Sequence, residues 1–217
     1  MENLDSTTSS TDNSNIQPNR SIQKELSRIF SVIFKDPTDG LKMYFADKTK
    51  TSVNISLSLY ILVFVVYIFG SALLFGDYAD NIDLVDYFKV GTMPVLVMLV
   101  ISVMSFILKS IFGKTEFKDE LITGGVSGIP IVLLMSGFVF LSFFKKNLIS
   151  KVMGDPFDLG VIAVLVFFYL FLLMINVFKQ SLRANGLKDS LAFFVSPISI
   201  FMSFYLAYQI GIKLFWI

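Results

Sequence analysis

The sequence predicts an all-α fold: a polytopic membrane protein with a bundle of five transmembrane helices and a short amphipathic helical segment before the first span. Of the 217 residues, 54% are hydrophobic and 16% are charged. The mean hydropathy of +0.71 exceeds what the core of a soluble domain can bury. The apolar residues gather in five runs of about 20 residues, the length at which a helix crosses about 30 Å of hydrocarbon. None of these runs contains Asp, Glu, Lys or Arg.

Residues 1–20 form the first predicted segment, a disordered polar tail. They carry three acidic side chains and no apolar run. They therefore lack both the composition of a folded element and the hydrophobic region of a signal peptide. A regulatory or partner-binding tail is the alternative, and a solvated terminus without such a role is the preferred interpretation.

Residues 21–50 form the second predicted segment, a pair of cytoplasmic amphipathic helices. Apolar residues recur there with helical spacing at Ile22, Leu26, Ile29 and Ile33. The stretch Asp36-Pro37-Thr38-Asp39 then predicts a new helix start, because Asp caps free amides and Pro fits a first helical turn.

Residues 51–217 form the predicted transmembrane domain. Its five spans lie at about 53–75, 90–108, 121–144, 159–178 and 191–212. Thirteen of the 18 Lys and Arg residues lie on the side of the membrane that the N-terminus occupies, with Lys145 and Lys146 as a local exception on the other side. Since basic residues near span ends are retained in the cytoplasm, we expect a cytoplasmic N-terminus and a C-terminus outside. The frequent Lys, Asn, Ile and Phe residues favour a bacterial inner (plasma) membrane.

Small residues predict where the helices pack, because helices in a bilayer associate through close backbone approach. In the third span, Gly124 and Gly128 lie four residues apart and Pro130 follows them. The last span carries a ridge of small side chains at Ser199, Ser203, Ala207 and Gly211. Packing within one bundle is the preferred interpretation of both surfaces, and a homo-oligomer interface is the alternative. Asn176 in the fourth span is predicted to hydrogen-bond across helices, the alternative being that it lines a substrate path.

The segment before the first span is basic. Candidate contacts with lipid headgroups or a partner protein are Lys24, Arg28, Lys35, Lys42, Lys48 and Lys50. Such side chains contribute up to about 1 kcal/mol each near an anionic bilayer surface. An ordinary helix pair packed under the bundle is an equally weighted interpretation. The expected partners are the lipid bilayer and other membrane proteins; the net charge of +1 gives no reason to expect nucleic acid.

The sequence gives no support for an enzyme, a cofactor or a metal site. It contains neither His nor Cys, which removes the commonest metal ligand, the usual general base and the thiolate nucleophile. Gly113-Lys114-Thr115 matches the end of a phosphate-binding loop, but Leu108 stands where that pattern requires Gly. No catalytic, cofactor-binding or metal-binding residue is predicted.

Four stretches carry a resemblance to a known family. They are FKDPTDGLKMYF (34–45), FGKTEFKDEL (112–121), GGVSGIPIVLL (124–134) and SLRANGLKDSLAF (181–193). Their order over residues 29–217 resembles the Yip family, five-span membrane proteins named for interaction with Rab-type GTPases. The chain is most similar to prokaryotic members, since residues 48–52 replace the DLYGP-like motif of eukaryotic ones. The resemblance implies a non-enzymatic five-helix protein that organises membranes.

Two hypotheses about function follow. The first is a non-enzymatic integral membrane protein that acts as a scaffold, adaptor or membrane-organising, trafficking-like component. Its working surface would be the basic cytoplasmic segment 20–50, with the loops around Lys114 and Lys188. The alternative is a small transporter or channel subunit, whose path would run between the spans and near Asn176. Five spans do not divide into two equal repeats, which weakens the second hypothesis.

Overall fold

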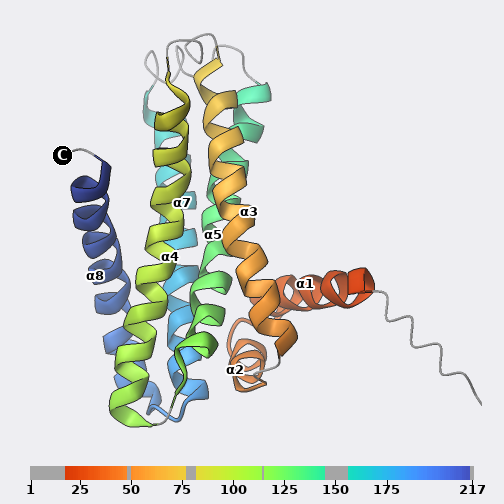
Figure 1. Ribbon diagram of the computed structural model, residues 1–217, viewed down its shortest axis with the longest axis vertical. Helices are drawn as coiled ribbons and strands as arrows, with labels where there is room; N and C mark the ends of the chain where they lie inside the picture. Colours follow the sequence, from red (N-terminus) through yellow and green to blue (C-terminus); the bar gives the residue numbers. More distant parts are fainter. Residues whose placement is uncertain (1–17, 48–49, 77–81, 114, 145–155, 216–217) are drawn as a thin grey trace, which may run out of the picture.

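The computed structural model describes residues 18–47, 50–76, 82–113, 115–144 and 156–215, and this part of the chain is helical with short turns (Figure 1). Its helices are α1 (Pro18–Lys35), α2 (Asp39–Ala46), α3 (Lys50–Phe75), α4 (Leu84–Phe112), α5 (Phe117–Phe144), α7 (Pro156–Ala184) and α8 (Asp189–Phe215). The predicted all-α class is confirmed, with short helices before five long ones. The predicted tail up to residue 17 and the exceptional pair Lys145 and Lys146 lie outside the described residues. Residues 18–20, predicted as the end of the tail, instead form the first turn of α1.

The five long helices each contain a candidate membrane span. These spans are Ser52–Phe75, Leu84–Phe112, Phe117–Phe140, Val164–Ala184 and Asp189–Phe215. The chain is therefore a multi-pass integral membrane protein, as predicted. Some helices run beyond the predicted apolar cores, because polar residues at their ends continue the helix. Asp86, for example, lies in the first turn of α4, where a carboxylate complements the positive end of the helix.

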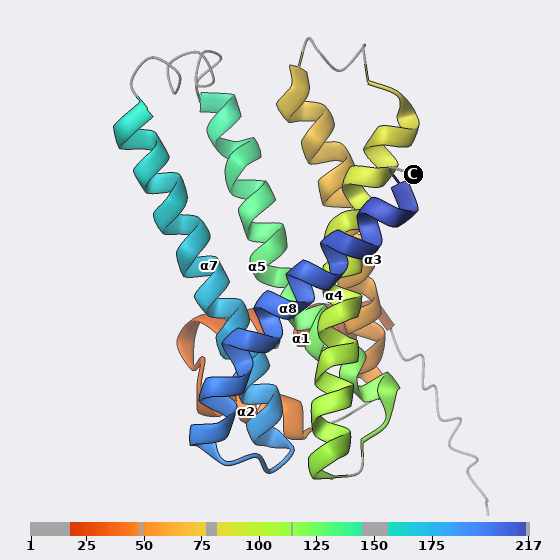
Figure 2. The ribbon, with the colours of Figure 1, turned by 90° about the vertical axis from the view of Figure 1, so that its left-hand side faces the viewer.

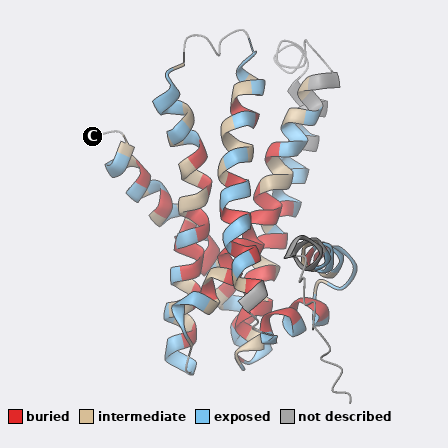
Figure 3. Cartoon of the chain, turned by 45° about the vertical axis from the view of Figure 1, so that its right-hand side comes forward, coloured by how far each residue is buried: buried red, intermediate tan, exposed pale blue. Residues whose placement is uncertain are grey.

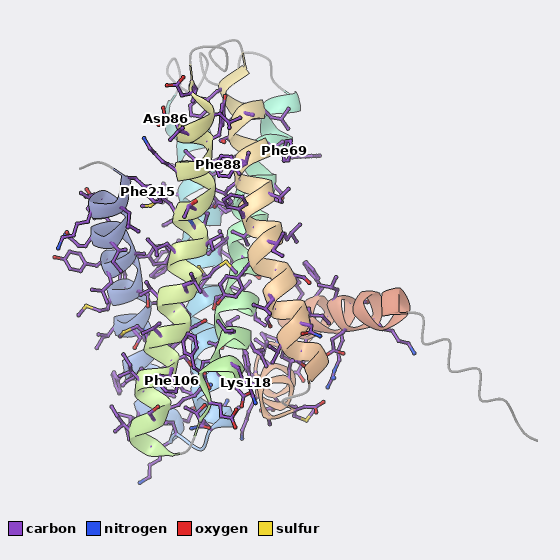
Figure 4. All side chains as sticks on the ribbon, in the orientation of Figure 1. Phe69, Asp86, Phe88, Phe106, Lys118 and Phe215 are labelled. Atoms are coloured by element: carbon purple, nitrogen blue, oxygen red, sulfur yellow. The ribbon has the colours of Figure 1, made fainter. Side chains whose placement is uncertain are left out.

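The long helices lie close together at one end of the bundle and separate toward the other. We call the end that carries α1 and α2 the α1–α2 end, and the other the opposite end. Figure 2 shows α5 and α7 diverging from α3 and α4 toward the opposite end, while α8 crosses the bundle obliquely. Buried residues are concentrated in the half nearer α1 and α2 (Figure 3). Asp86 and Lys118 mark the two ends (Figure 4).

We call the half of the bundle nearer α1 and α2 the closed half and the other the open half. Helix α5 lies at the centre of the closed half and contacts α3, α4 and α7. Residues 122–131 are all buried, so every face of α5 meets protein over this length. Glycine makes this close packing possible. A Cβ at Gly124 would overlap the Tyr60 hydroxyl on α3 and the Met98 carbonyl on α4, and one at Gly125 would lie 2.8 Å from the Cα of Ser56.

The turn between α7 and α8 ends one helix and aligns the next. Gly186 has φ +90°, the left-handed conformation that favours glycine at a helix C-terminus. The Gly186 amide donates to the Arg183 carbonyl (3.0 Å) and the Leu187 amide to the Leu182 carbonyl (3.3 Å). Both leucines are buried. This pairing satisfies the last carbonyls of α7 and reverses the chain into α8.

The first prediction compares two glycines of α5. Gly124→Ala should lower the free energy of unfolding by about 1–3 kcal/mol, the usual cost of overpacking, because its Cβ overlaps atoms of α3 and α4. Gly137→Ala is the control, since a Cβ there meets nothing within 4 Å. It should be neutral or stabilise by up to about 1 kcal/mol through helix propensity. Thermal unfolding in detergent measures both, and equal effects would contradict this account of α5 packing.

Candidate functional site

Helix α1 lies crosswise at the α1–α2 end of the bundle (Figure 1). Its inward face is formed by Ile29 and Ile33, which are fully buried in a cluster with Leu41 and Phe45 of α2 and with side chains of α3, α5 and α7. This apolar face therefore docks the segment on the bundle, and α1 is a packed element of the fold.

The turn between α1 and α2 contains the predicted helix start. Helix α2 begins at Asp39, two residues after Pro37. The Asp36 carboxylate accepts a hydrogen bond from the Asp39 amide (3.2 Å), which satisfies one of the free amides of the first turn. Gly40 fits directly against Asp36, since a Cβ there would lie 3.0 Å from that side chain.

The predicted basic surface is only partly described. Its exposed cations are Lys24, Arg28, Lys35 and Lys42. Lys48 lies outside the described residues, and Lys50 begins α3 without a described side chain. The α1–α2 end thus presents at least these four cations around the buried apolar face of α1.

Arg28 is the most constrained of these cations. Its guanidinium lies 3.5 Å from the Glu25 carboxylate and 3.4 Å from the Asp47 carboxylate. It also lies 5.8 Å from the centroid of the Tyr44 ring. Burial raises the pKa of Tyr44 to about 12, so the ring under the cation is neutral at any physiological pH. Arg28 therefore joins α1 to α2, although exposed pairs of this kind contribute little to stability.

Asn176 lies beside the α1–α2 turn. Its side-chain amide donates to the Pro37 carbonyl (2.7 Å), and its carbonyl accepts from the Gln180 amide (3.1 Å). The chain of polar contacts continues along α7, where Arg183 donates to Gln180 (2.8 Å) and pairs with Asp189 (2.9 Å). Asn176 therefore connects α7 to the segment before the first span.

A second polar cluster lies inside the bundle, where α4, α5 and α7 meet. Lys109 Nζ is 2.6 Å from Glu120 Oε2, and their side chains are 3% and 0% exposed. Lys109 also donates to Ser181 of α7 (2.7 Å). Ser105 donates to the same Glu120 oxygen (2.6 Å), and Thr115 to the other (2.7 Å). We call these residues, with Thr123, the Lys109–Glu120 cluster.

Helix geometry favours this placement of the two charges. Lys109 lies in the last turn of α4 and Glu120 in the first turn of α5, so each complements the partial charge of its own helix end. The Thr123 hydroxyl lies 2.6 Å from the Ser181 hydroxyl, and this hydrogen bond joins α5 to α7. Burying two charges is costly unless each is paired and hydrogen-bonded, and both conditions are met here. The cluster therefore links α4, α5 and α7 through hydrogen bonds and one ion pair.

Sequence reasoning misses this cluster, because both charges lie just outside the predicted cores 90–108 and 121–144. Lys109 is thereby grouped with the solvated cations on the N-terminal side of the membrane, whereas the structure buries it. One signal could have revealed it. Ser105 and Lys109 are four residues apart and Glu120 and Thr123 three apart, so each pair shares one helix face.

The second prediction is a double-mutant cycle on the ion pair. Lys109→Met or Glu120→Leu alone should each destabilise the protein by about 3–5 kcal/mol, because each leaves an unpaired buried charge. The double variant should cost much less than the sum of the two, since neither charge remains. Thermal unfolding in detergent gives the three values. Additive losses would show that the two charges are not coupled.

The residues predicted to pack helices together are buried by contacts within one copy of the chain. Gly124, Gly128 and Pro130 are buried in α5. The α8 ridge of Ser199, Ser203, Ala207 and Gly211 is also buried, and a Cβ at Gly211 would overlap the Met93 side chain of α4. The C-terminal end of the ridge, at Gly211, therefore packs against α4.

No protein-family model, curated protein sequence or solved structure matches this chain. The class of protein is therefore defined by the fold and the site: a multi-pass integral membrane protein with five candidate spans and an amphipathic helix docked at one end. Within the described ranges, no three carboxylates lie close enough together to hold a metal ion.

Proposed function

We propose that this chain is a non-enzymatic membrane scaffold or adaptor that organises membranes by presenting α1 and α2 in the headgroup layer. The observation that carries the proposal is α1, which is docked crosswise at the end of the spans (Figure 1). Its exposed cations and exposed aromatics occupy different positions around the helix. The resemblance to the Yip family supports the same function.

The outer surface of α1 is amphipathic. Phe30 and Phe34 are 38% and 48% exposed beside the buried face. At the helical repeat of 3.6 residues, they lie about 120° around the helix from the basic side chains. These basic side chains are Lys24, Arg28 and Lys35. Such a helix suits a bilayer surface, with its aromatics toward the acyl chains and its cations toward the headgroups.

The attachment of this segment to the bundle supports a scaffold. The Asn176 side chain bonds the Pro37 carbonyl, and Ile29 and Ile33 pack into the core of the bundle. A partner or a lipid surface would therefore meet a fixed platform. We place this platform in the cytoplasm of a bacterial cell, on the argument that basic residues near spans are retained there.

The third prediction tests the depth of α1 in the bilayer. The chain contains no Cys, so single-cysteine variants can carry an environment-sensitive fluorophore. A label at Phe34→Cys should emit at shorter wavelength in vesicles than one at Lys24→Cys, because position 34 faces the acyl chains. Phe69→Cys on lipid-exposed α3 is the apolar reference (Figure 4). Water-like emission from both α1 positions would contradict the proposed placement.

The fourth prediction concerns protein partners. A photo-crosslinking residue at Met43, which is 65% exposed on α2, should form discrete adducts with membrane-associated proteins in cells. Lys42→Glu should reduce them about tenfold if charge contributes about 1.4 kcal/mol to binding. Lys213→Glu, at an exposed cation near the C-terminal end of α8, is the matched control. Adducts insensitive to Lys42→Glu would refute a charge-dependent platform.

The fifth prediction separates a scaffold from a transporter. Asn176→Leu should destabilise the docking of α1 and α2 by about 1 kcal/mol through the lost hydrogen bond. Hydrogen exchange of residues 36–47 should then become faster. Purified protein in vesicles should show no selective solute flux, with or without the substitution. A robust flux that Asn176→Leu abolishes would overturn the scaffold proposal and favour transport.

A further inference from the structure

A cavity of about 310 Å³ lies between the long helices and is lined by side chains from all five of them. Along α7 its wall passes from Phe167, which is 52% exposed, to Leu170 and Met174, which are 7% and 4% exposed. On α8 its wall includes Tyr208, which is 56% exposed. The cavity therefore has a mouth between Phe167 and Tyr208 and a closed base near Met174.

The mouth opens sideways within the span region. Phe167 lies seven residues before Met174 on α7, which is about 10 Å along the helix axis, and the chain runs there from the opposite end toward α1 and α2. Figure 2 shows α7 and α8 separating toward the opposite end. The mouth is thus on the side of the bundle that faces lipid, in the open half.

The lining selects an apolar occupant. It consists of Val, Ile, Leu, Phe, Met and Pro side chains and of two tyrosines, which carry its only side-chain polar groups. One of them, Tyr67, already donates its hydroxyl to the Ile131 carbonyl (3.3 Å). A buried water needs two to four polar partners, and the cavity supplies too few. An empty cavity would forfeit dispersion contacts along its whole wall.

The position of the mouth selects the kind of apolar molecule. The surrounding medium at this depth is phospholipid acyl chain, and the volume is near the lower limit of about 300–1,000 Å³ for ligand pockets, so it suits one chain. The lining contains neither Lys nor Arg, so the carboxylate of a free fatty acid drawn inside would be unpaired. A phospholipid can leave its headgroup outside.

We propose that this cavity is a binding site for one acyl chain of a membrane phospholipid, which enters between Phe167 and Tyr208 and ends near Met174. The site does not depend on the platform formed by α1 and α2, because it lies in the spans and opens toward the other half of the bundle.

The test uses the full purified chain in detergent micelles, so that bulk phospholipid does not compete. A trace of phospholipid with a photoactivatable diazirine in one acyl chain is added, and adducts are mapped by peptide mass spectrometry. The proposal expects adducts on the cavity faces of α7 and α8, with labelling that saturates and is displaced by unlabelled phospholipid. Labelling of the unmodified chain that does not saturate, or that spreads evenly over the lipid-exposed surface, would overturn it.

Filling the cavity provides the matched comparison. Val97→Phe with Leu170→Trp places bulk inside it from α4 and α7 and should reduce labelling about tenfold, a loss of about 1.4 kcal/mol. Val103→Phe with Leu172→Trp adds the same bulk to the exposed faces of the same helices and should leave labelling unchanged. Thermal unfolding establishes that both variants fold; if the filled variant does not, displacement on the unmodified chain decides. A free diazirine fatty acid that labels the cavity in place of the phospholipid would overturn the proposal.

Discussion

The close approach of α5 to α3 and α4 is the constraint on which the rest of the structure depends. With no side chain at Gly124 and Gly125, the backbones come within contact distance in one half of the bundle. That approach brings the first turn of α5 to the last turn of α4, where Lys109 and Glu120 meet. It also provides a closed surface against which α7, α1 and α2 pack.

The two halves of the bundle have different physical characters. The half near α1 and α2 is held by small-residue contacts and by hydrogen bonds among buried polar groups, which gain strength where water is excluded. In the other half, α5 and α7 diverge from α3 and α4 (Figure 2), and the cavity between the helices is lined mainly by apolar side chains. The closed half therefore fixes the platform of α1 and α2, while the open half is accessible to lipid.

The number and position of the spans were predictable, because twenty apolar residues without charge have few alternatives to a transmembrane helix. The capping role of Asp36 was also accessible from local pattern. The Lys109–Glu120 cluster was accessible only as polar pairs on single helix faces, since the way these faces meet depends on the mutual rotation of three helices, which packing sets. For Asn176 the sequence predicted a hydrogen bond but not its acceptor, because the Pro37 carbonyl is 139 residues away in the chain and lies in a turn outside the spans. The cavity depends on helix tilt, which span length does not determine.

The short separation of Lys109 and Glu120, 11 residues across the turn between α4 and α5, bears on how the chain is made. Either charge alone would resist entry into the bilayer during synthesis, at a cost of several kcal/mol near its centre and less toward its surface. Because the two are near neighbours, α4 and α5 can enter as a helical hairpin that is already electrically neutral. Their insertion then need not await the synthesis of α7, whose Ser181 joins a pair already formed.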